Sequence, residues 1–135
     1  MPGSFFDTSV LIYIASAETT KADRAEQLLR QGGIVSVQVL NEIANVARRK
    51  MQMSWAETRA FLTTLRALVE VRPVTAELHE DGLSLAERYN LSVYDALIAA
   101  AALQADCDTL RSEDLQHGFV IDSRLRVVNP FLPSN

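Results

Sequence analysis

A chain of 135 residues with 48% hydrophobic and 22% charged residues has the composition of one globular domain, which we expect to span residues 1–135. Its net charge of -4 and pI near 5.1 argue against a broad basic face for nucleic acid, so such chemistry would need local basic patches or metal ions. No apolar run could cross a bilayer, no signal peptide is recognisable and the single cysteine excludes an internal disulfide, which indicates a cytoplasmic protein with no membrane association.

Residues 4–13 combine a short apolar strand, which ends at Asp7, with the start of a first helix at about 10–15. A strand covered by helices on both faces should be apolar throughout and become polar only where it leaves the sheet. Asp7 would then lie at the carboxyl edge, where open α/β sheets bind their ligands. The same residues allow a simpler interpretation, in which Asp7, helped by Thr8 and Ser9, only caps the following helix.

The later elements alternate in type. Helices are predicted at 21–30, at 38–50, after Ser54 with apolar residues as far as Leu68, at 76–89 and from Ser92 to about Leu103; strands are predicted at 34–37, 69–74, 108–110, 119–121 and 125–128. Residues 111–118 are expected to form a polar loop or short helix. This alternation predicts a single three-layer α/β/α sandwich with a mainly parallel sheet.

Two of these helices are informative in detail. The helix after Ser54 has a capping-box spacing to Glu57. Its apolar side is predicted to contain Trp55, Phe61, Leu62, Leu65 and Leu68. The helix after Ser92 has almost no polar face, which predicts burial among other elements, and Asp95 is the sole charge in its first turns.

Four acidic residues border apolar sequence at the end of a strand or helix or at the edge of a helix stripe: Asp7, Glu42, Asp95 and Asp114. Grouped carboxylates raise one another's pKa unless something neutralises them, and the adjacent sequence offers only Arg111 as a cation. Oxygen ligands without histidine or thiolate select Mg²⁺ or Mn²⁺ over zinc. Such ions would activate water and stabilise the leaving oxygen of a phosphodiester, which indicates metal-assisted hydrolysis.

Each of these acids also has a purely structural interpretation. Asp95 lies three residues after Ser92, which is a capping-box spacing. Glu42 could be a solvated residue at a helix edge, and Asp114, which follows Ser112 in a polar loop, could belong to an Asx turn. These interpretations explain less well why an apolar strand end and an apolar helix start both carry aspartate.

Four short stretches carry a resemblance to a known family. They are Asp7-Thr8-Ser9-Val10-Leu11, Asn41-Glu42, Tyr94-Asp95-Ala96 at the start of the alanine-rich helix, and Ser112-Glu113-Asp114-Leu115. In this order, over nearly the whole chain, they resemble the PIN-domain ribonucleases, and among these the VapC-type toxins of bacterial toxin-antitoxin pairs.

The resemblance implies a parallel sheet with acidic residues converging at one edge, where they bind Mg²⁺ or Mn²⁺ and cleave RNA. By position it implies Asp7, Glu42 and Asp95 as the core metal ligands and catalytic residues, with Asp114 as the fourth acid. Ser112 matches a hydroxyl residue that accompanies that acid, while Glu113 leaves open which carboxylate faces the metal. The resemblance also implies a homodimer, and an antitoxin whose C-terminal segment covers the acidic pocket.

Other candidate sites have less support. His79 and His117 are far apart with no ligand spacing, so neither is expected to bind metal, and no phosphate-binding glycine motif is present. The basic run 48–50 could contact an RNA backbone or simply suit the end of its helix, and both interpretations stay open. Trp55 and Phe61 are expected to be core or dimer contacts rather than platforms for base stacking.

Three functions follow as hypotheses. The first is a metal-dependent endoribonuclease that acts as the toxin of a type II toxin-antitoxin system. The second is an aspartyl-phosphate enzyme, a phosphatase or receiver-like domain with Asp7 as nucleophile, although Ser9 stands where the haloacid dehalogenase-like pattern has a second aspartate. The third is a catalytically silent PIN-like binding module in which the acids are caps and salt-bridge members.

Overall fold

The computed structural model of the protein describes residues 3–133. Its elements in chain order are β1 (Ser4–Phe6), α1 (Thr8–Leu11), the 3-10 helix η1 (Ile12–Ala15), α2 (Thr19–Arg30), β2 (Ile34–Ser36), α3 (Val37–Arg49), α4 (Trp55–Arg66), β3 (Glu70–Arg72), α5 (Ala76–Tyr89), α6 (Val93–Gln104), β4 (Thr109–Arg111), β5 (Val120–Ile121) and β6 (Leu125–Val128). Each predicted helix and strand is present, and most of their ends fall within one or two residues of the expected positions.

The six strands form one sheet in the order β3-β2-β1-β4-β6-β5. All neighbouring pairs are parallel except β5 and β6, which form an antiparallel hairpin. The chain moves outward from β1 in one direction to β2 and β3, and later returns to pair β4 with the other side of β1. Such a reversal of strand order opens a crevice at the carboxyl ends of the two strands, here β1 and β4.

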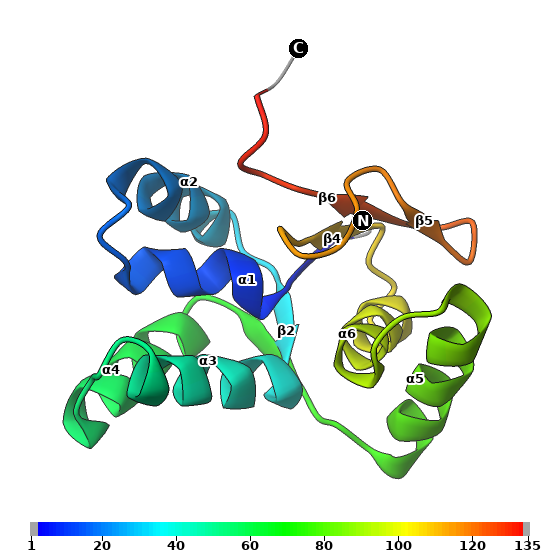
Figure 1. Ribbon diagram of the computed structural model, residues 1–135, viewed down its shortest axis with the longest axis horizontal. Coiled ribbons are helices and arrows are strands. Elements are labelled where there is room, and N and C mark those ends of the chain that lie inside the picture. The colour runs from blue at the N-terminus through cyan, green and yellow to red at the C-terminus, as the bar shows by residue number, and fades with distance from the viewer. Residues whose placement is uncertain (1–2, 134–135) are drawn as a thin grey trace.

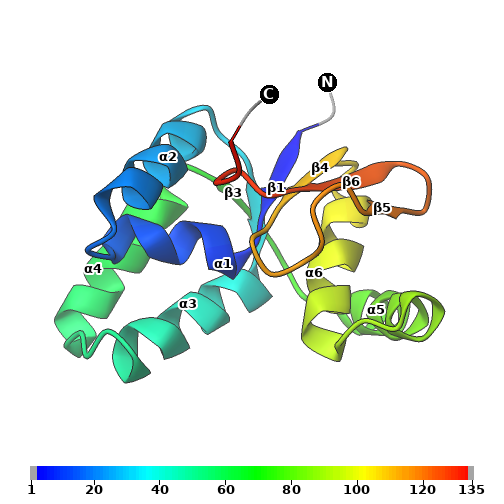
Figure 2. The ribbon, with the colours of Figure 1, turned by 45° about the horizontal axis from the view of Figure 1, so that its top comes forward.

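Helices cover the sheet on both sides (Figures 1 and 2). The helices α1 to α4 lie on one side of β1 and β2, while α5 and α6 lie on the other. The predicted three-layer α/β/α sandwich with a mainly parallel sheet is therefore confirmed.

Burial follows the apolar patterns that predicted these elements. Phe5 and Phe6 of β1 are fully buried, as expected for a central strand covered on both faces. In α6, every residue from Ala96 to Leu103 is buried. The small alanine side chains let this helix approach the sheet closely, and it contacts β2, β4 and β6. The predicted capping box of α4 is present, with Ser54 and Glu57 exchanging hydrogen bonds.

Two side chains assigned to the apolar side of α4 do not pack in the core. Trp55 is 62% exposed and Leu68 is 43% exposed, so a core contact is wrong for Trp55, whose predicted alternative is a dimer contact, and Leu68 lies outside the buried part of the apolar side. Trp55 stands in the first turn of α4, beyond the edge of the core, and its ring lies under the Arg48 guanidinium at 4.3 Å from the ring centroid. Phe61 does pack against the core.

Cys107 is buried, and burial together with the charge of Asp108 raises the pKa of its thiol to about 11. The thiol therefore stays protonated and contributes to packing, as its acidic neighbours indicate. Within residues 3–133, no helix combines the length and the apolar content of a membrane span.

Candidate functional site

Asp7 follows β1 directly and is 4% exposed. Its carboxylate does not cap α1, because it accepts no hydrogen bond from a backbone N–H in the first turn of that helix. Instead, Oδ2 accepts hydrogen bonds from the Ser112 hydroxyl at 2.8 Å and from the Ser9 hydroxyl at 2.9 Å. The interpretation of Asp7 as a cap is therefore wrong, and the residue is a buried acid held by two hydroxyl groups.

Burial raises the pKa of Asp7 from 3.8 to about 6. The hydrogen bonds from Ser112 and Ser9 oppose this shift, while the negative charges of Asp114 and Glu42 add to it. A carboxylate in this position is short of positive charge, since the two hydroxyl groups supply donors without a net charge.

Glu42 lies on the α3 face that borders Asp7. Its two carboxylate oxygens accept hydrogen bonds from Thr8 and from Gln38, each at 2.8 Å. Thr8 follows Asp7 in the chain, so this contact joins the end of β1 to α3 across 34 positions. Glu42 is thus half-buried and oriented, and is not the freely solvated helix-edge residue that its structural interpretation describes.

Asp95 and Asp114 approach the same place from two other segments. Asp95 lies in the first turn of α6, where its backbone N–H donates to Ser92 Oγ, so the capping function predicted from the spacing is present in part. Burial raises the pKa of Asp114, and the charges of Asp95, Glu113 and Glu42 raise it further. The charges of Asp95 and Glu42 raise the pKa of Asp114, and those of Asp114 and Glu42 raise the pKa of Asp7. The four predicted acids therefore lie in one region of the molecule.

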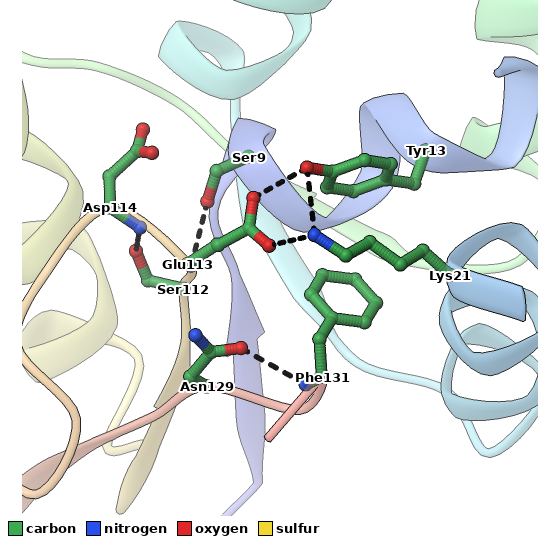
Figure 3. A network of polar contacts seen from close by, with 8 residues as sticks. All are labelled: Ser9, Tyr13, Lys21, Ser112, Glu113, Asp114, Asn129 and Phe131. Carbon is green, nitrogen blue, oxygen red and sulfur yellow. Dashed lines mark hydrogen bonds and ion pairs between the residues drawn. The ribbon is translucent and has the colours of Figure 1, made fainter. Parts of the chain in front are cut away.

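In the loop after β4, the carboxylates of the adjacent residues Glu113 and Asp114 point in different directions (Figure 3). The Glu113 carboxylate accepts hydrogen bonds from Tyr13 and from Lys21, both at 2.6 Å. The Lys21 ammonium also lies over the rings of Tyr13 and Phe131, at 4.6 and 5.3 Å from their centroids. Asp114 points away from this cluster, and within residues 3–133 its carboxylate has no hydrogen-bond or ion-pair partner.

The partners of Glu113 have the expected effect on its pKa. Burial alone would raise it, but the hydrogen bonds from Lys21 and Tyr13 outweigh burial and hold the pKa of Glu113 below its usual value. Glu113 is therefore already neutralised by the chain. Of the two neighbouring acids, Asp114 is the one that remains available to a cation.

Glu42, Glu113 and Asp114 line an open cleft of about 540 Å³, whereas Asp7 and Asp95 are not part of its lining. The rest of the lining includes Thr8, Ser9, Asn45, Lys50 and Met51. Lys50 is the sole cation in the part of this lining that the structure describes, and its charge lowers the pKa of Asp114. Arg111, the cation expected from sequence, turns out to be half-buried close to Arg24 and pairs with none of the four acids among residues 3–133.

The donor set of the cleft fits a hard divalent cation. It offers carboxylate and hydroxyl oxygens, while His79 and His117 lie elsewhere, with His117 Nδ1 accepting from the Asn129 N–H. Over the described residues, no three of the acidic, histidine or cysteine side chains are close enough together to form a complete chelating group in this conformation. The raised pKa of both Asp7 and Asp114 is the observation that calls for additional positive charge.

Several residues of the site gave no separate signal in the sequence. Lys21, Tyr13 and Gln38 are ordinary polar positions of their helices, and nothing in their spacing links them to an acid far away in the chain. The sequence predicts no hydrogen bond between Ser9 and Asp7, yet the Ser9 hydroxyl donates to Asp7 and accepts from the Glu113 N–H at 3.0 Å. Only the serine-rich neighbourhood of Asp7 and Asp114 could have indicated this role.

A mainly parallel α/β/α sheet with acidic residues at the carboxyl ends of two neighbouring strands defines a class of α/β proteins with their site at that edge. Within this class the chain belongs to the PIN domain family, whose model matches residues 4–118. No curated protein sequence matches the chain.

Three solved structures show the same fold. A toxin-antitoxin complex from Klebsiella pneumoniae is similar with a TM-score of 0.70 and 24% identity over 95% of this chain and 98% of that one. VapC20 of Mycobacterium tuberculosis, a toxin that cleaves the sarcin-ricin loop, has a TM-score of 0.69 and 23% identity, covering 82% and 89%. VapBC2 of Rickettsia felis, bound to a DNA fragment from its promoter, has a TM-score of 0.57 and 19% identity, covering 82% and 87%. The predicted resemblance to the PIN domain and to the fold of VapC toxins is confirmed.

Proposed function

We propose that residues 1–135 form one nuclease domain that hydrolyses RNA phosphodiester bonds with the help of Mg²⁺ or Mn²⁺. The observation that carries this proposal is the buried Asp7 carboxylate, whose pKa is raised to about 6 by burial and, to a smaller extent, by the charges of Asp114 and Glu42. Membership of the PIN domain family and the VapC-like fold support it.

Asp7, Glu42, Asp95 and Asp114 would hold the metal. When bound, the cation neutralises the phosphodiester and makes water a better nucleophile. The chain itself fixes the ligands in advance. Ser112 and Ser9 orient Asp7 through their hydroxyl groups, Thr8 and Gln38 orient Glu42, and the bonds of Glu113 hold the loop that carries Asp114.

Lys50 has a separate role in this proposal. It lines the same cleft as Glu42 and Asp114, at the end of the basic run that closes α3. A lysine at this position can contact a phosphate of the RNA, which the overall net charge of -4 would otherwise repel.

Asparagine substitutions test the role of the acids. Asp7→Asn and Asp95→Asn keep the size of each side chain but remove the negative charge that a cation requires. We expect each to reduce Mg²⁺-dependent RNA cleavage at least about 100-fold while the circular dichroism spectrum stays that of the wild type. Asp122→Asn, in the turn between β5 and β6, is the matched control and should cleave normally. Full cleavage by both site variants would refute the proposal.

The biological setting belongs to the same proposal. We propose that the protein is the toxin of a type II toxin-antitoxin pair in the cytoplasm, that it forms a homodimer, and that an antitoxin segment covers the acidic cleft. Two of the similar structures are a toxin-antitoxin complex and the VapBC2 assembly. Size-exclusion chromatography of the purified chain tests the dimer, and co-purification of a small protein bound to the tagged chain from its native cells tests the pairing with an antitoxin.

The aspartyl-phosphate hypothesis has less support. Asp7 Oδ2 is engaged by two hydroxyl groups, and among residues 3–133 Lys21 bonds Glu113 rather than Asp7. A catalytically silent binding module is the main alternative. A rise in melting temperature on addition of Mn²⁺ or Mg²⁺ distinguishes an active nuclease from it.

A further inference from the structure

A second groove adjoins the acidic cleft and has different chemistry. It has a volume of about 590 Å³ and is lined by Gln38, Asn41, Glu42, Asn45 and Tyr94. Glu42 and Asn45 line both this groove and the acidic cleft, so the two are continuous. Whatever substrate occupies the acidic cleft can therefore extend into the second groove.

Tyr94 is the aromatic residue in the lining of this groove. It is 64% exposed and stands in the first turn of α6, where Val93 is also exposed at 44%, whereas the following residues from Ala96 to Leu103 are buried. Its hydroxyl makes no hydrogen bond and its ring stacks on no other aromatic ring within residues 3–133. An aromatic ring left this exposed contributes little to packing, yet it is adjacent in the chain to the predicted metal ligand Asp95.

The opposite side of the groove carries amide groups. Asn41 and Asn45 are four residues apart on α3, so they lie one above the other on the same helix face. Both are exposed, and neither side chain has a hydrogen-bond partner in the described part of the chain. An amide offers a donor and an acceptor side by side, which matches the edge of a nucleobase.

Charge also favours a base over a phosphate in this groove. In the described lining of the two clefts, Lys50 is the sole cation, against Glu42, Glu113 and Asp114 as anions. Attraction to the phosphate backbone can therefore supply only a small part of the affinity for RNA. Stacking of a base on an aromatic ring needs no charge, and it contributes roughly 1–3 kcal/mol per base.

We propose that this groove is a nucleobase subsite, in which an unpaired base beside the cleaved phosphodiester stacks on Tyr94 while Asn41 and Asn45 contact its edge. The inference rests on the proposed function and narrows its substrate to RNA with an unpaired base at the cleavage site. A base inside a duplex has both faces covered by its neighbours and could not reach the ring.

The test measures binding without the metal. A single-stranded oligoadenylate that carries 2-aminopurine is titrated in EDTA against the wild type, Tyr94→Ala and Tyr94→Phe. Tyr94→Ala should weaken binding roughly 5- to 150-fold, the range that corresponds to one stacked base, and Tyr94→Phe should bind as the wild type does because stacking does not need the hydroxyl. The dependence of Kd on salt should be unchanged in Tyr94→Ala but reduced in Lys50→Gln, because this slope counts phosphate contacts.

Trp55→Ala is the matched control. Trp55 is 62% exposed, similar to Tyr94, but it lines neither groove, so this variant should bind as the wild type does. Cleavage assays with Mn²⁺ should show a raised KM for Tyr94→Ala, while the rise in melting temperature caused by Mn²⁺ alone stays that of the wild type.

The outcomes separate the two proposals. If the wild type cleaves RNA and Tyr94→Ala keeps both its Kd and its KM, the subsite is wrong and the nuclease function stands. An equal loss of RNA affinity in Tyr94→Ala and Trp55→Ala would also overturn the subsite, since it would indicate a general effect of exposed aromatic rings. A wild type that neither binds nor cleaves RNA would refute the nuclease function and the subsite with it.

Discussion

Asp7 has the chemistry of a ligand rather than that of a structural acid. It is buried at the end of the central strand β1, next to two hydroxyl donors and within the electrostatic reach of Asp114 and Glu42. A purely structural aspartate would gain stability from its surroundings, whereas burial raises the pKa of Asp7. The carboxylate therefore lowers the stability of the metal-free fold, which indicates a role in binding.

The direction of this effect with pH follows from the two pKa values. In the unfolded chain Asp7 has its ordinary pKa of 3.8, whereas in the folded protein the pKa is about 6. The folded state binds the proton more tightly than the unfolded chain does. The contribution of Asp7 to the free energy of unfolding is therefore greatest below about pH 4 and falls as the pH rises to about 6. Above that pH the full loss remains, on the order of 3 kcal/mol.

Asp7→Asn should remove this loss. We expect the variant in EDTA to be more stable than the wild type by up to about 3 kcal/mol at pH 7.5, and to match it near pH 4. Urea denaturation at a series of pH values measures the difference. A wild type and a variant with parallel pH profiles would show that the pKa of Asp7 is not raised.

At the level of elements, Glu113 joins two consecutive helices to a loop that lies about 100 residues further along the chain. Lys21 of α2, Tyr13 of η1 and the loop after β4 are joined by its carboxylate, and its backbone N–H donates to Ser9 beside Asp7 (Figure 3). The same loop carries Ser112, which bonds Asp7, and Asp114. The contacts of Glu113 therefore hold the loop that carries Ser112 and Asp114.

Lys21→Met tests this positioning role. The variant keeps an apolar stem against Tyr13 and Phe131 but loses the ion pair to Glu113. We expect Mn²⁺ to bind up to about tenfold more weakly, with faster hydrogen exchange at the amides of Asp114 and Leu115 and nearly unchanged stability. Calorimetry and exchange mass spectrometry provide these measurements.

Arg88→Met is the matched control for this change, because it breaks a comparable ion pair to Asp122 that lies outside the acidic cleft. It should leave Mn²⁺ affinity at the wild-type value. If both variants bind Mn²⁺ as the wild type does, the contacts of Glu113 are structural only.

For the whole molecule, the metal binding proposed for the acidic cleft would be linked to folding. The four acids proposed as ligands lie directly after β1, in α3, in α6 and in the loop after β4, and these segments come together only in the folded chain. A cation that needs all of them binds the native state alone and must raise its melting temperature.

A melting experiment therefore separates a nuclease from a silent binding module. At a Mn²⁺ concentration about one hundred times its Kd, the free energy of unfolding should increase by about 2.7 kcal/mol. This increase corresponds to a rise in melting temperature of roughly 10 °C for a chain of this size. Asp114→Asn should reduce this rise, while Glu113→Gln should reduce it less, because Glu113 is already paired with Lys21. A melting temperature that does not respond to Mn²⁺ or Mg²⁺ would favour the binding module.

The sequence by itself determined the order of the elements and the kind of sheet they form. Apolar runs of strand length alternate with helical periods, and this local pattern depends only on neighbouring residues, as in the buried strand that ends at Asp7 and the alanine-rich α6. The tertiary structure alone decided which side chains meet. It paired Glu113 with Lys21 and left Asp114 free of partners within residues 3–133, exposed Trp55, and brought Tyr94 beside Asn45. The physical reason is that such contacts join residues many positions apart, and their partners depend on strand order and helix placement, which no local pattern contains.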